Sequence, residues 1–402
     1  MLNFLELPFE LVLAVLRFLS NEELRHLSLV CRHLRQDCQA MLLKTCTIPI
    51  TLDRSVEEYR ELFQTSHFKE SIHFMSFRGV AEPNGYTSTD KRGVLAEVAG
   101  YIPTLHRLQC IEMTRIEPTI LLLDAIFRST FNKPMKLVLR HNVYPEEYKF
   151  PSQDLKIHYI EATVINSSHN ASQYATISRV FLPRLVSACA ATLTSLHIYD
   201  HYHNNRWDIP PVPLMWDIPP VQLKSLTVTA TQDPSLVAFL QSQTYLEELT
   251  IRRDNLGVKG WASRLSRSDL PNLRSVTASH GSLRYLLPGR AIREANPTTY
   301  YTRDYSYKEV YDFLYNTCPS AAGNGVESLD LGSFMYDWMG IGVLSRYQGS
   351  LSNIRNLVIP CGEMVRQSCV LPEHFLRPWK GIFKDLCLPQ EPLETDLSLY
   401  YR

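Results

Sequence analysis

A triplet of apolar residues recurs along this 402-residue chain, spaced as apolar, two residues, apolar, one residue, apolar. The copies are Leu105/Leu108/Cys110, Pro134/Leu137/Leu139, Leu193/Leu196/Ile198, Leu223/Leu226/Val228, Leu246/Leu249/Ile251, Leu273/Val276/Ala278, Val326/Leu329/Leu331, Ile354/Leu357/Ile359 and Phe383/Leu386/Leu388. Most copies begin about 23 to 30 residues after the previous one, and two longer gaps are close to double that unit. The first long gap contains a degraded copy, Leu155/His158/Ile160. Short units of this kind bury their apolar faces by stacking on one another.

The middle and last apolar residues of each triplet alternate on a short strand, so both face the interior. The turn or helix that follows covers this interior, and neighbouring units share one continuous core. Repeats of about 20–29 residues with this pattern are typical of leucine-rich repeats. We therefore predict an α/β fold, an irregular leucine-rich-repeat-like solenoid over residues 101–390, with a parallel sheet on its concave face. Because the period is irregular, a generic α/β fold with leucine-rich strands remains the alternative.

Residues that flank the inward-facing pair of each predicted strand point toward the concave face. They form the predicted substrate-binding surface, which consists of His197, Tyr199, Thr227, Thr250, Arg252, Thr277 and Asp330, together with Thr229 and Ser279. Asn142 follows one triplet at the place where such repeats often carry an asparagine. The sequence therefore predicts a polar recognition surface and does not identify its ligand.

The first forty residues have the periodicity of short amphipathic helices. Pro8 suits the first turn of a helix, because its missing N–H would be unpaired there in any case. Ser20 and Glu23 have the spacing of a capping box, which marks the start of a second helix. Two or three helices of this size bury too little surface to be stable alone, and their many leucines exceed the needs of one small core. Some of these leucines are therefore expected to pack against another part of the chain or another protein.

Residues 4–46 resemble an F-box in the order and spacing of Leu7-Pro8-x-Glu10-Leu11, then Leu16 and Leu19, then Glu23-Leu24, Leu27 and Val30-Cys31-Arg32. The resemblance implies a small three-helix unit that docks on the adaptor subunit of an SCF ubiquitin ligase and, through the adaptor, on cullin. By match, the residues that line this contact or its supporting core are Leu7, Pro8, Leu11, Leu16, Leu24, Leu27, Val30, Cys31 and Arg32. An ordinary helical hairpin that caps a larger fold is the alternative.

Composition narrows the classes of function. Lys plus Arg and Asp plus Glu are both 41, so the zero net charge disfavours general binding to nucleic acid or to anionic lipid. No stretch reaches the ~20 apolar residues that span a bilayer, and the start lacks the charge pattern of a signal peptide. Nine scattered cysteines without a C-x-x-C pair predict reduced thiols, hence the cytoplasm or the nucleus.

No motif for catalysis or for a cofactor is found. The chain has no Walker A loop, G-x-S-x-G, H-E-x-x-H or G-x-G-x-x-G. His197, Asp200, His201 and His203 cluster in sequence, but alternation on a strand separates Asp200 from His197, and no other ligand is suitably spaced. We therefore expect no metal, no cofactor and no catalysis by this chain.

Segments between the triplets complete the predicted organisation. The duplicated Trp-Asp-Ile-Pro-Pro-Val at 207–212 and 216–221 predicts an extended surface insertion, since paired prolines block helix and central strand. A helix is expected over 56–63, and another over 307–315 in a tyrosine-rich stretch. The predicted domains are the F-box at 1–46, a linking segment with a first irregular repeat at 47–100, the repeat domain at 101–390, and a tail at 391–402.

These features together predict a non-catalytic substrate-recognition subunit of an SCF-type ubiquitin ligase. The F-box would hold the adaptor, and the repeats would present a protein substrate of unknown identity. The alternative is an adaptor-bound scaffold that takes no part in ubiquitin transfer. An enzyme with an unrecognised site would need a deep pocket with convergent titratable groups.

Overall fold

The computed structural model of the chain forms two compact units, Met1–Val221 and Gln222–Arg402. We describe each unit by itself. The structure describes residues 8–50, 56–64, 66–79, 91–131, 133–142, 144–145, 147–151, 155–165, 180–201, 221–229, 234–252, 261–298, 326–330 and 356–358. The predicted helix at 307–315, almost all of the duplicated segment, and the Phe383/Leu386/Leu388 triplet lie outside these residues.

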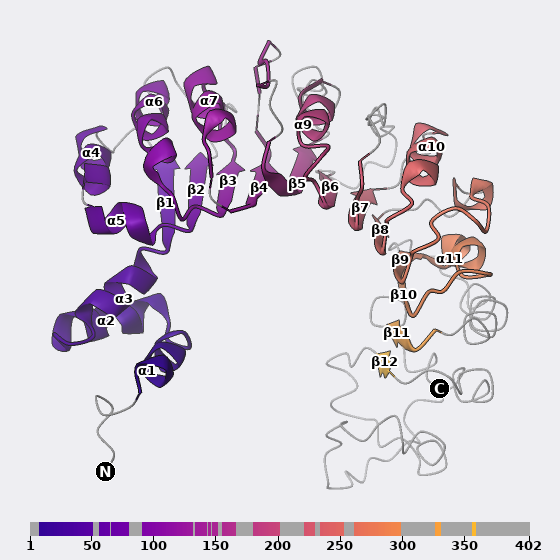
Figure 1. Cartoon of the computed structure of the whole chain (residues 1–402), viewed down its shortest axis with the longest axis horizontal. Helices are drawn as coiled ribbons and strands as arrows, with labels where there is room; N and C mark the ends of the chain where they lie inside the picture. Colours follow the sequence, from indigo (N-terminus) through magenta and orange to yellow (C-terminus); the bar gives the residue numbers. More distant parts are fainter. Residues whose placement is uncertain are drawn as a thin grey trace, which may run out of the picture. The chain divides into compact units, whose positions relative to one another are not determined.

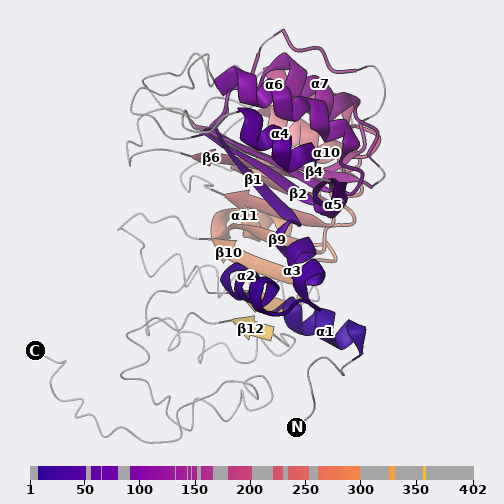
Figure 2. The same cartoon turned by 90° about the vertical axis from the view of Figure 1, so that its left-hand side faces the viewer.

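The first unit begins with three short helices, α1 (Phe9–Leu16), α2 (Asn21–Val30) and α3 (Arg35–Leu42). Pro8 is the N-cap residue of α1, and the predicted capping box opens α2. The Ser20 hydroxyl accepts a hydrogen bond from the Glu23 amide at 3.3 Å, and the Glu23 carboxylate accepts one from the Ser20 amide at 2.7 Å. Figure 2 shows the chain running from α3 into the first strand.

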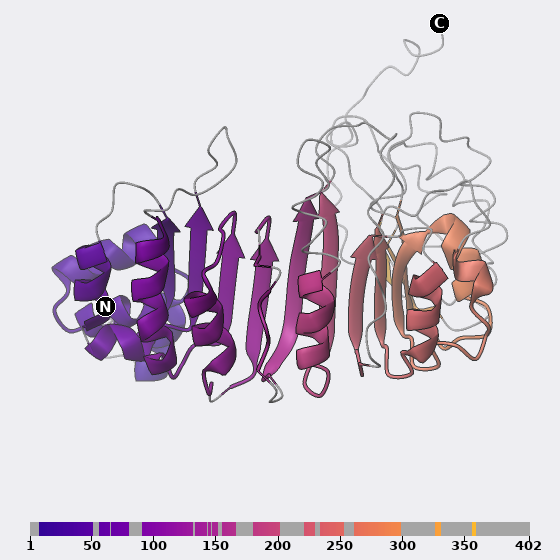
Figure 3. The same cartoon turned by 90° about the horizontal axis from the view of Figure 1, so that it is seen from above.

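The rest of the first unit is a parallel sheet in which each strand pairs with the next along the chain. Its strands are β1 (Thr45–Ile50), β2 (Phe74–Gly79), β3 (Cys110–Thr114), β4 (Met135–Arg140), β5 (Ile157–Ile165) and β6 (Ser195–His201). Its further helices are α4 (Val56–Gln64), α5 (Ser66–Ser71), α6 (Lys91–Tyr101), the 3-10 turn η2 (Ile102–Thr104), α7 (Ile120–Arg128) and α9 (Leu182–Ala188). Figures 1 and 3 show α4, α6, α7 and α9 on one face of this sheet. The opposite face bears no helix among the described residues, and we call it the helix-free face.

The second unit repeats the same arrangement. Its parallel strands are β7 (Ser225–Thr229), β8 (Glu248–Arg252), β9 (Ser275–Ser279), β10 (Glu294–Thr298), β11 (Ser328–Asp330) and β12 (Asn356–Val358), each paired with the next. Its helices are α10 (Pro234–Ser242), the 3-10 turn η4 (Trp261–Arg264) and α11 (His280–Leu286). Each repeat thus consists of one strand and one covering segment, which is the architecture that the apolar triplets predict. The α/β leucine-rich-repeat-like fold is confirmed.

The cores of both units are ladders of apolar side chains at matching register positions. In the first unit, the paired residues are Cys46, Met75, Ile111, Leu137, Ile160 and Leu196, all 5% exposed or less. In the second unit, Leu226, Leu249, Val276 and Ala295 occupy the same position and are at most 1% exposed. Side chains two residues further along each strand extend the same buried layer.

Two of the predicted triplets are wrong in register. Ile111 of β3 pairs with Leu137 of β4, so the β3 triplet is Leu108/Ile111/Met113 and not Leu105/Leu108/Cys110. Ile160 pairs with Leu196, so the β5 copy ends at Ala162 and not at Ile160. In both cases, a second set of residues that begins before the strand has the spacing of a triplet, and only the hydrogen-bonded register separates the two possibilities.

The second long gap contains a copy that the pattern missed. Ile292, Ala295 and Pro297 have the triplet spacing, and Ala295 pairs with Val276 of β9. Pro297 cannot donate a ladder hydrogen bond, and the pairing of β10 with β11 covers only Glu294 and Ala295. The small and unusual side chains of this copy conceal a regular strand.

Asn142 has the structural role that its position after a triplet predicts. Its side-chain oxygen accepts from the Ile116 amide at 3.0 Å, and its side-chain nitrogen donates to the Met113 carbonyl at 2.8 Å. The same nitrogen donates to the Tyr144 hydroxyl at 3.0 Å, and Asn142 is only 2% exposed. Asn142 therefore satisfies backbone groups at the end of β3 that would otherwise be buried without partners.

Candidate functional site

The N-terminal helices have a closed core on one side. Buried residues of all three helices form it, namely Val12, Leu16, Leu24, Leu34 and Cys38, with Leu19, Leu27, Cys31, Met41 and Leu42 packed at its edge. Arg35 also ties α3 to α2, since its Nε donates to the Ser28 carbonyl at 3.0 Å. Burial of about five apolar side chains, each contributing ~1.5–3 kcal/mol, holds the three helices together.

A second set of apolar side chains on the same helices is left in solvent. Leu11, Val15 and Phe18 lie at positions i, i+4 and i+7 and are 51%, 41% and 90% exposed. This spacing places them on one side of α1 and its C-terminal turn. Leu29 and Val30, at the end of α2, are 74% and 81% exposed. We call these five residues the exposed apolar residues.

The structure separates the predicted adaptor-binding residues into three groups. Leu16 and Leu24 are buried in the helical core, with Leu27 and Cys31 partly buried against it. Pro8, Leu11, Val30 and Arg32 are exposed, and Leu7 lies outside the described residues. The sequence prediction missed Val15, Phe18 and Leu29. The spacing of Leu11, Val15 and Phe18, four and then three residues apart, could have indicated that they share one side of a helix.

A network of charged and hydrogen-bonded side chains crosses the helix-free face of β2 to β5. The Glu112 carboxylate lies 3.1 Å from Arg140 Nη1 and 3.9 Å from Arg78 Nη2, and it accepts a hydrogen bond from the Ser76 hydroxyl at 3.1 Å. Arg140 Nη2 donates to Glu161 at 3.0 Å on the next strand. Four neighbouring strands therefore contribute to one network.

Tyrosine and lysine extend this network toward the start of the strands. The Tyr159 hydroxyl donates to Glu161 at 3.1 Å, and the Lys136 ammonium lies 3.9 Å from the centre of the Tyr159 ring. The His197 ring is 4.8 Å from the same ring. We call Arg78, Glu112, Lys136, Arg140, Tyr159 and Glu161 the sheet-face cluster. Burial, with Glu161 nearby, raises the pKa of Tyr159, so the phenol remains a neutral donor at physiological pH.

None of the residues of the sheet-face cluster belongs to the predicted substrate surface, whose members are distributed over both units. His197 and Tyr199 lie on β6 with the alternation that places them on the helix-free face. In the second unit, Thr227, Thr250 and Thr277 occupy one register row, and Arg252 lies one row further on. The side chains of Thr229 and Asp330 lie outside the described part of the chain, and Ser279 caps α11 by accepting from the Ser282 amide at 3.3 Å.

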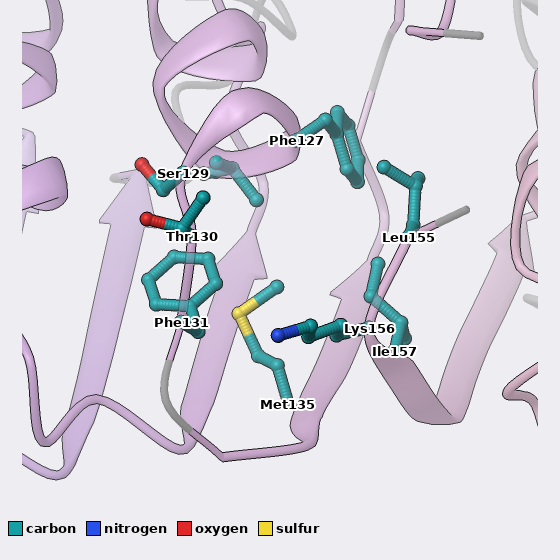
Figure 4. A pocket seen from close by; sticks show the side chains of 9 residues that line it. Phe127, Ser129, Thr130, Phe131, Met135, Leu155, Lys156 and Ile157 are labelled. Carbon is teal, nitrogen blue, oxygen red and sulfur yellow. The ribbon is translucent and has the colours of Figure 1, made fainter. Parts of the chain in front are cut away.

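A cavity of about 120 Å³ lies between α7 and strands β4 and β5 (Figure 4). It is lined mainly by apolar side chains, among them Phe127, Phe131, Met135 and Leu155, with Lys156 as its one ionisable residue. The cavity thus holds no pair of titratable groups of the kind that acid–base catalysis uses. Among the described residues, no cluster of His, Cys, Asp and Glu is arranged to hold a metal ion, and no helix is long and apolar enough to span a bilayer.

The fold and the exposed helical surface define a class, a parallel-sheet repeat protein with a small N-terminal helical domain that leaves apolar side chains in solvent. Residues 4–42 match the family model described as F-box-like. The chain therefore carries an F-box-like domain at residues 4–42, and leucine-rich-repeat-like units follow it. No curated protein sequence matches it. A solved structure, titled "Crystal structure of Rad7 and Elc1 complex in yeast", contains a chain that is 13% identical, with a TM-score of 0.36. That similarity covers 89% of this chain and 82% of the other.

Proposed function

We propose that the chain is the substrate-recognition subunit of an SCF-type ubiquitin ligase. The F-box-like domain docks on the adaptor, which links it to cullin, and the repeat units hold a protein substrate. The chain itself performs no chemistry. It raises the effective concentration of a substrate lysine near a ubiquitin-charged enzyme.

The observation that carries this proposal is the solvent exposure of the five exposed apolar residues within an F-box-like domain whose core is already complete. Phe18, at 90% exposed, contributes nothing to that core, and the solvation of five such side chains is unfavourable until a partner covers them. The described cysteines are free, which fits our placement of the protein in the cytoplasm or the nucleus.

Reconstitution with purified subunits tests the proposal. The full chain is co-expressed with an SCF adaptor subunit and then mixed with cullin, and complex formation is followed by size-exclusion chromatography. We expect the chain to co-elute with both, and Leu29→Ala to weaken the complex. Leu121→Ala is the matched control, because Leu121 is 61% exposed on α7, away from the F-box-like helices. Failure to bind the adaptor would contradict the proposal.

A scaffold function outside ubiquitin transfer is the second candidate, because the same surface would serve it. The two candidates differ in one outcome of the reconstitution. A scaffold co-elutes with the adaptor but excludes cullin, whereas a ligase subunit co-elutes with both.

A further inference from the structure

We propose that the sheet-face cluster binds an acidic, extended segment of the substrate through its carboxylates. This inference deepens the proposed function, on which it rests, by assigning the chemistry of the substrate to a particular part of the repeat sheet. The cluster lies on the helix-free face of the first unit, so all of its members belong to one compact unit.

Exposure within the cluster separates the two signs of charge. The side chains of Glu112 and Glu161 are 7% and 15% exposed, whereas those of Arg78 and Arg140 are 59% and 45% exposed. The carboxylates therefore lie against the sheet, with the guanidinium groups reaching outward over them. An approaching chain meets the positive groups first, although the network holds only one more cation than anion.

Hydrogen-bonding capacity favours the same kind of ligand. The Glu112 carboxylate accepts from Ser76 and contacts Arg140, and the Glu161 carboxylate accepts from Arg140 and from the Tyr159 hydroxyl. A guanidinium has five N–H donors, and the described contacts of Arg140 use two of them. The cluster thus has donors to offer and few acceptors, so a carboxylate-rich ligand is complementary and a cationic ligand is not.

The buried carboxylates also fix the direction of the cations. Arg140 bridges Glu112 and Glu161 through two different nitrogens, which holds its plane across β3 to β5. Arg78 donates through Nε to the Ser76 hydroxyl at 3.3 Å. Donors that are oriented before the ligand arrives lose little conformational entropy on binding. Arg78 and Arg140 lie two strands apart, about 10 Å, so one extended peptide of a few residues reaches both.

Fluorescence anisotropy with the full chain tests the inference. The probe is a fluorescein-labelled decapeptide of alternating Asp and Gly, which presents carboxylates about 6.8 Å apart on one face when extended. The matched peptides replace Asp with Asn, with Lys or with phosphoserine. We expect the Asp peptide to bind and to be released by 0.5 M salt, as for any ligand held by surface charges. The Asn and Lys peptides are expected not to bind.

Variants locate the binding. Arg78→Gln and Lys136→Gln are each expected to weaken binding of the Asp peptide about two- to fivefold, the range for one exposed ion pair. Arg60→Gln is the control, because Arg60 is an exposed arginine paired with Glu97 at 3.1 Å on the helical face, and it removes the same charge. Equal weakening by all three variants, or by none, would overturn the inference.

Two further outcomes would overturn the inference without touching the proposed function. One is a chain that joins the adaptor and cullin but binds no Asp peptide. The other is binding of the phosphoserine peptide alone, which would assign the cluster to phosphate. Conversely, if the chain binds the Asp peptide through Arg78 but binds no adaptor, the ligase function is refuted. The assignment of the sheet-face cluster to an acidic segment would then still hold.

Discussion

Phe18 offers the sharpest test of the adaptor-binding surface, because its ring is 90% exposed just after α1. Phe18→Ala removes an aromatic ring that packs on almost nothing in the free chain, so the free energy of unfolding should change by less than about 0.5 kcal/mol. If the adaptor buries the ring, the variant loses about 2 kcal/mol of binding free energy. That loss corresponds to an approximately 30-fold higher Kd.

Isothermal titration calorimetry with the adaptor subunit measures the Kd, and thermal unfolding of the free chain measures stability. Leu16→Ala provides the contrast, because Leu16 is fully buried and its truncation should cost about 2–5 kcal/mol of stability. A Phe18→Ala variant that binds within twofold of the parent chain would show that the adaptor does not cover the ring. A large loss of stability in that variant would show that the ring packs within the chain.

Three further predictions concern the repeat scaffold. Gly79→Ala should destabilise the first unit by about 1–3 kcal/mol in thermal unfolding, because an added Cβ would lie 1.9 Å from the Arg115 carbonyl oxygen. Asn142→Ala should cost about 2–4 kcal/mol in denaturant unfolding, because it leaves buried backbone groups unpaired. Burial lowers the pKa of His73 below its usual 6.5. As the pH falls, His73 is therefore protonated in the unfolded chain before it is protonated in the folded chain. Its contribution to stability is present above pH 6.5 and is lost as the pH falls toward the folded pKa. In denaturant unfolding at a series of pH values, His73→Gln should therefore reduce the slope of the free energy of unfolding against pH in this range.

The sequence predicts the helices of the F-box-like domain but not which of their faces is free. The capping box of Ser20 and Glu23 has a local cause, and the structure confirms it. The sequence of α1, by contrast, is FELVLAVL, so apolar residues lie on nearly every side. Such a helix has no polar face to mark its outer surface. Only packing against α2 and α3 separates the buried Leu16 from the exposed Val15.

The repeats were predictable because each repeat must bury the side chains at the middle and last positions of its triplet against its neighbours. Where those side chains are large, as in Leu249 and Ile251 of β8, the pattern alone locates the strand. In β10 the corresponding residues are Ala295 and Pro297, and apolar periodicity gives no reason to select them. Pairing with β9 establishes the strand, and that information is not local in sequence.

Glu112 of the sheet-face cluster was missed through an error of register, and the size of the error explains the loss. The predicted β3 triplet was displaced by three residues, an odd number. Because side chains alternate along a strand, an odd displacement exchanges the two faces. The mistaken register therefore turned Ile111 toward the surface and Glu112 toward the core, whereas the structure buries Ile111 in the ladder and places Glu112 on the helix-free face. With the register of β3 corrected, the same rule of flanking residues that selected His197 on β6 also selects Glu112. On β4 the predicted triplet was in register, and on β5 it was displaced by two residues, which leaves the faces unchanged. The pattern therefore already placed Arg140 and Glu161 on the helix-free face, and the prediction omitted them. The prediction thus failed through the alignment of one repeat at Glu112, and through the choice among correctly placed residues at Arg140 and Glu161.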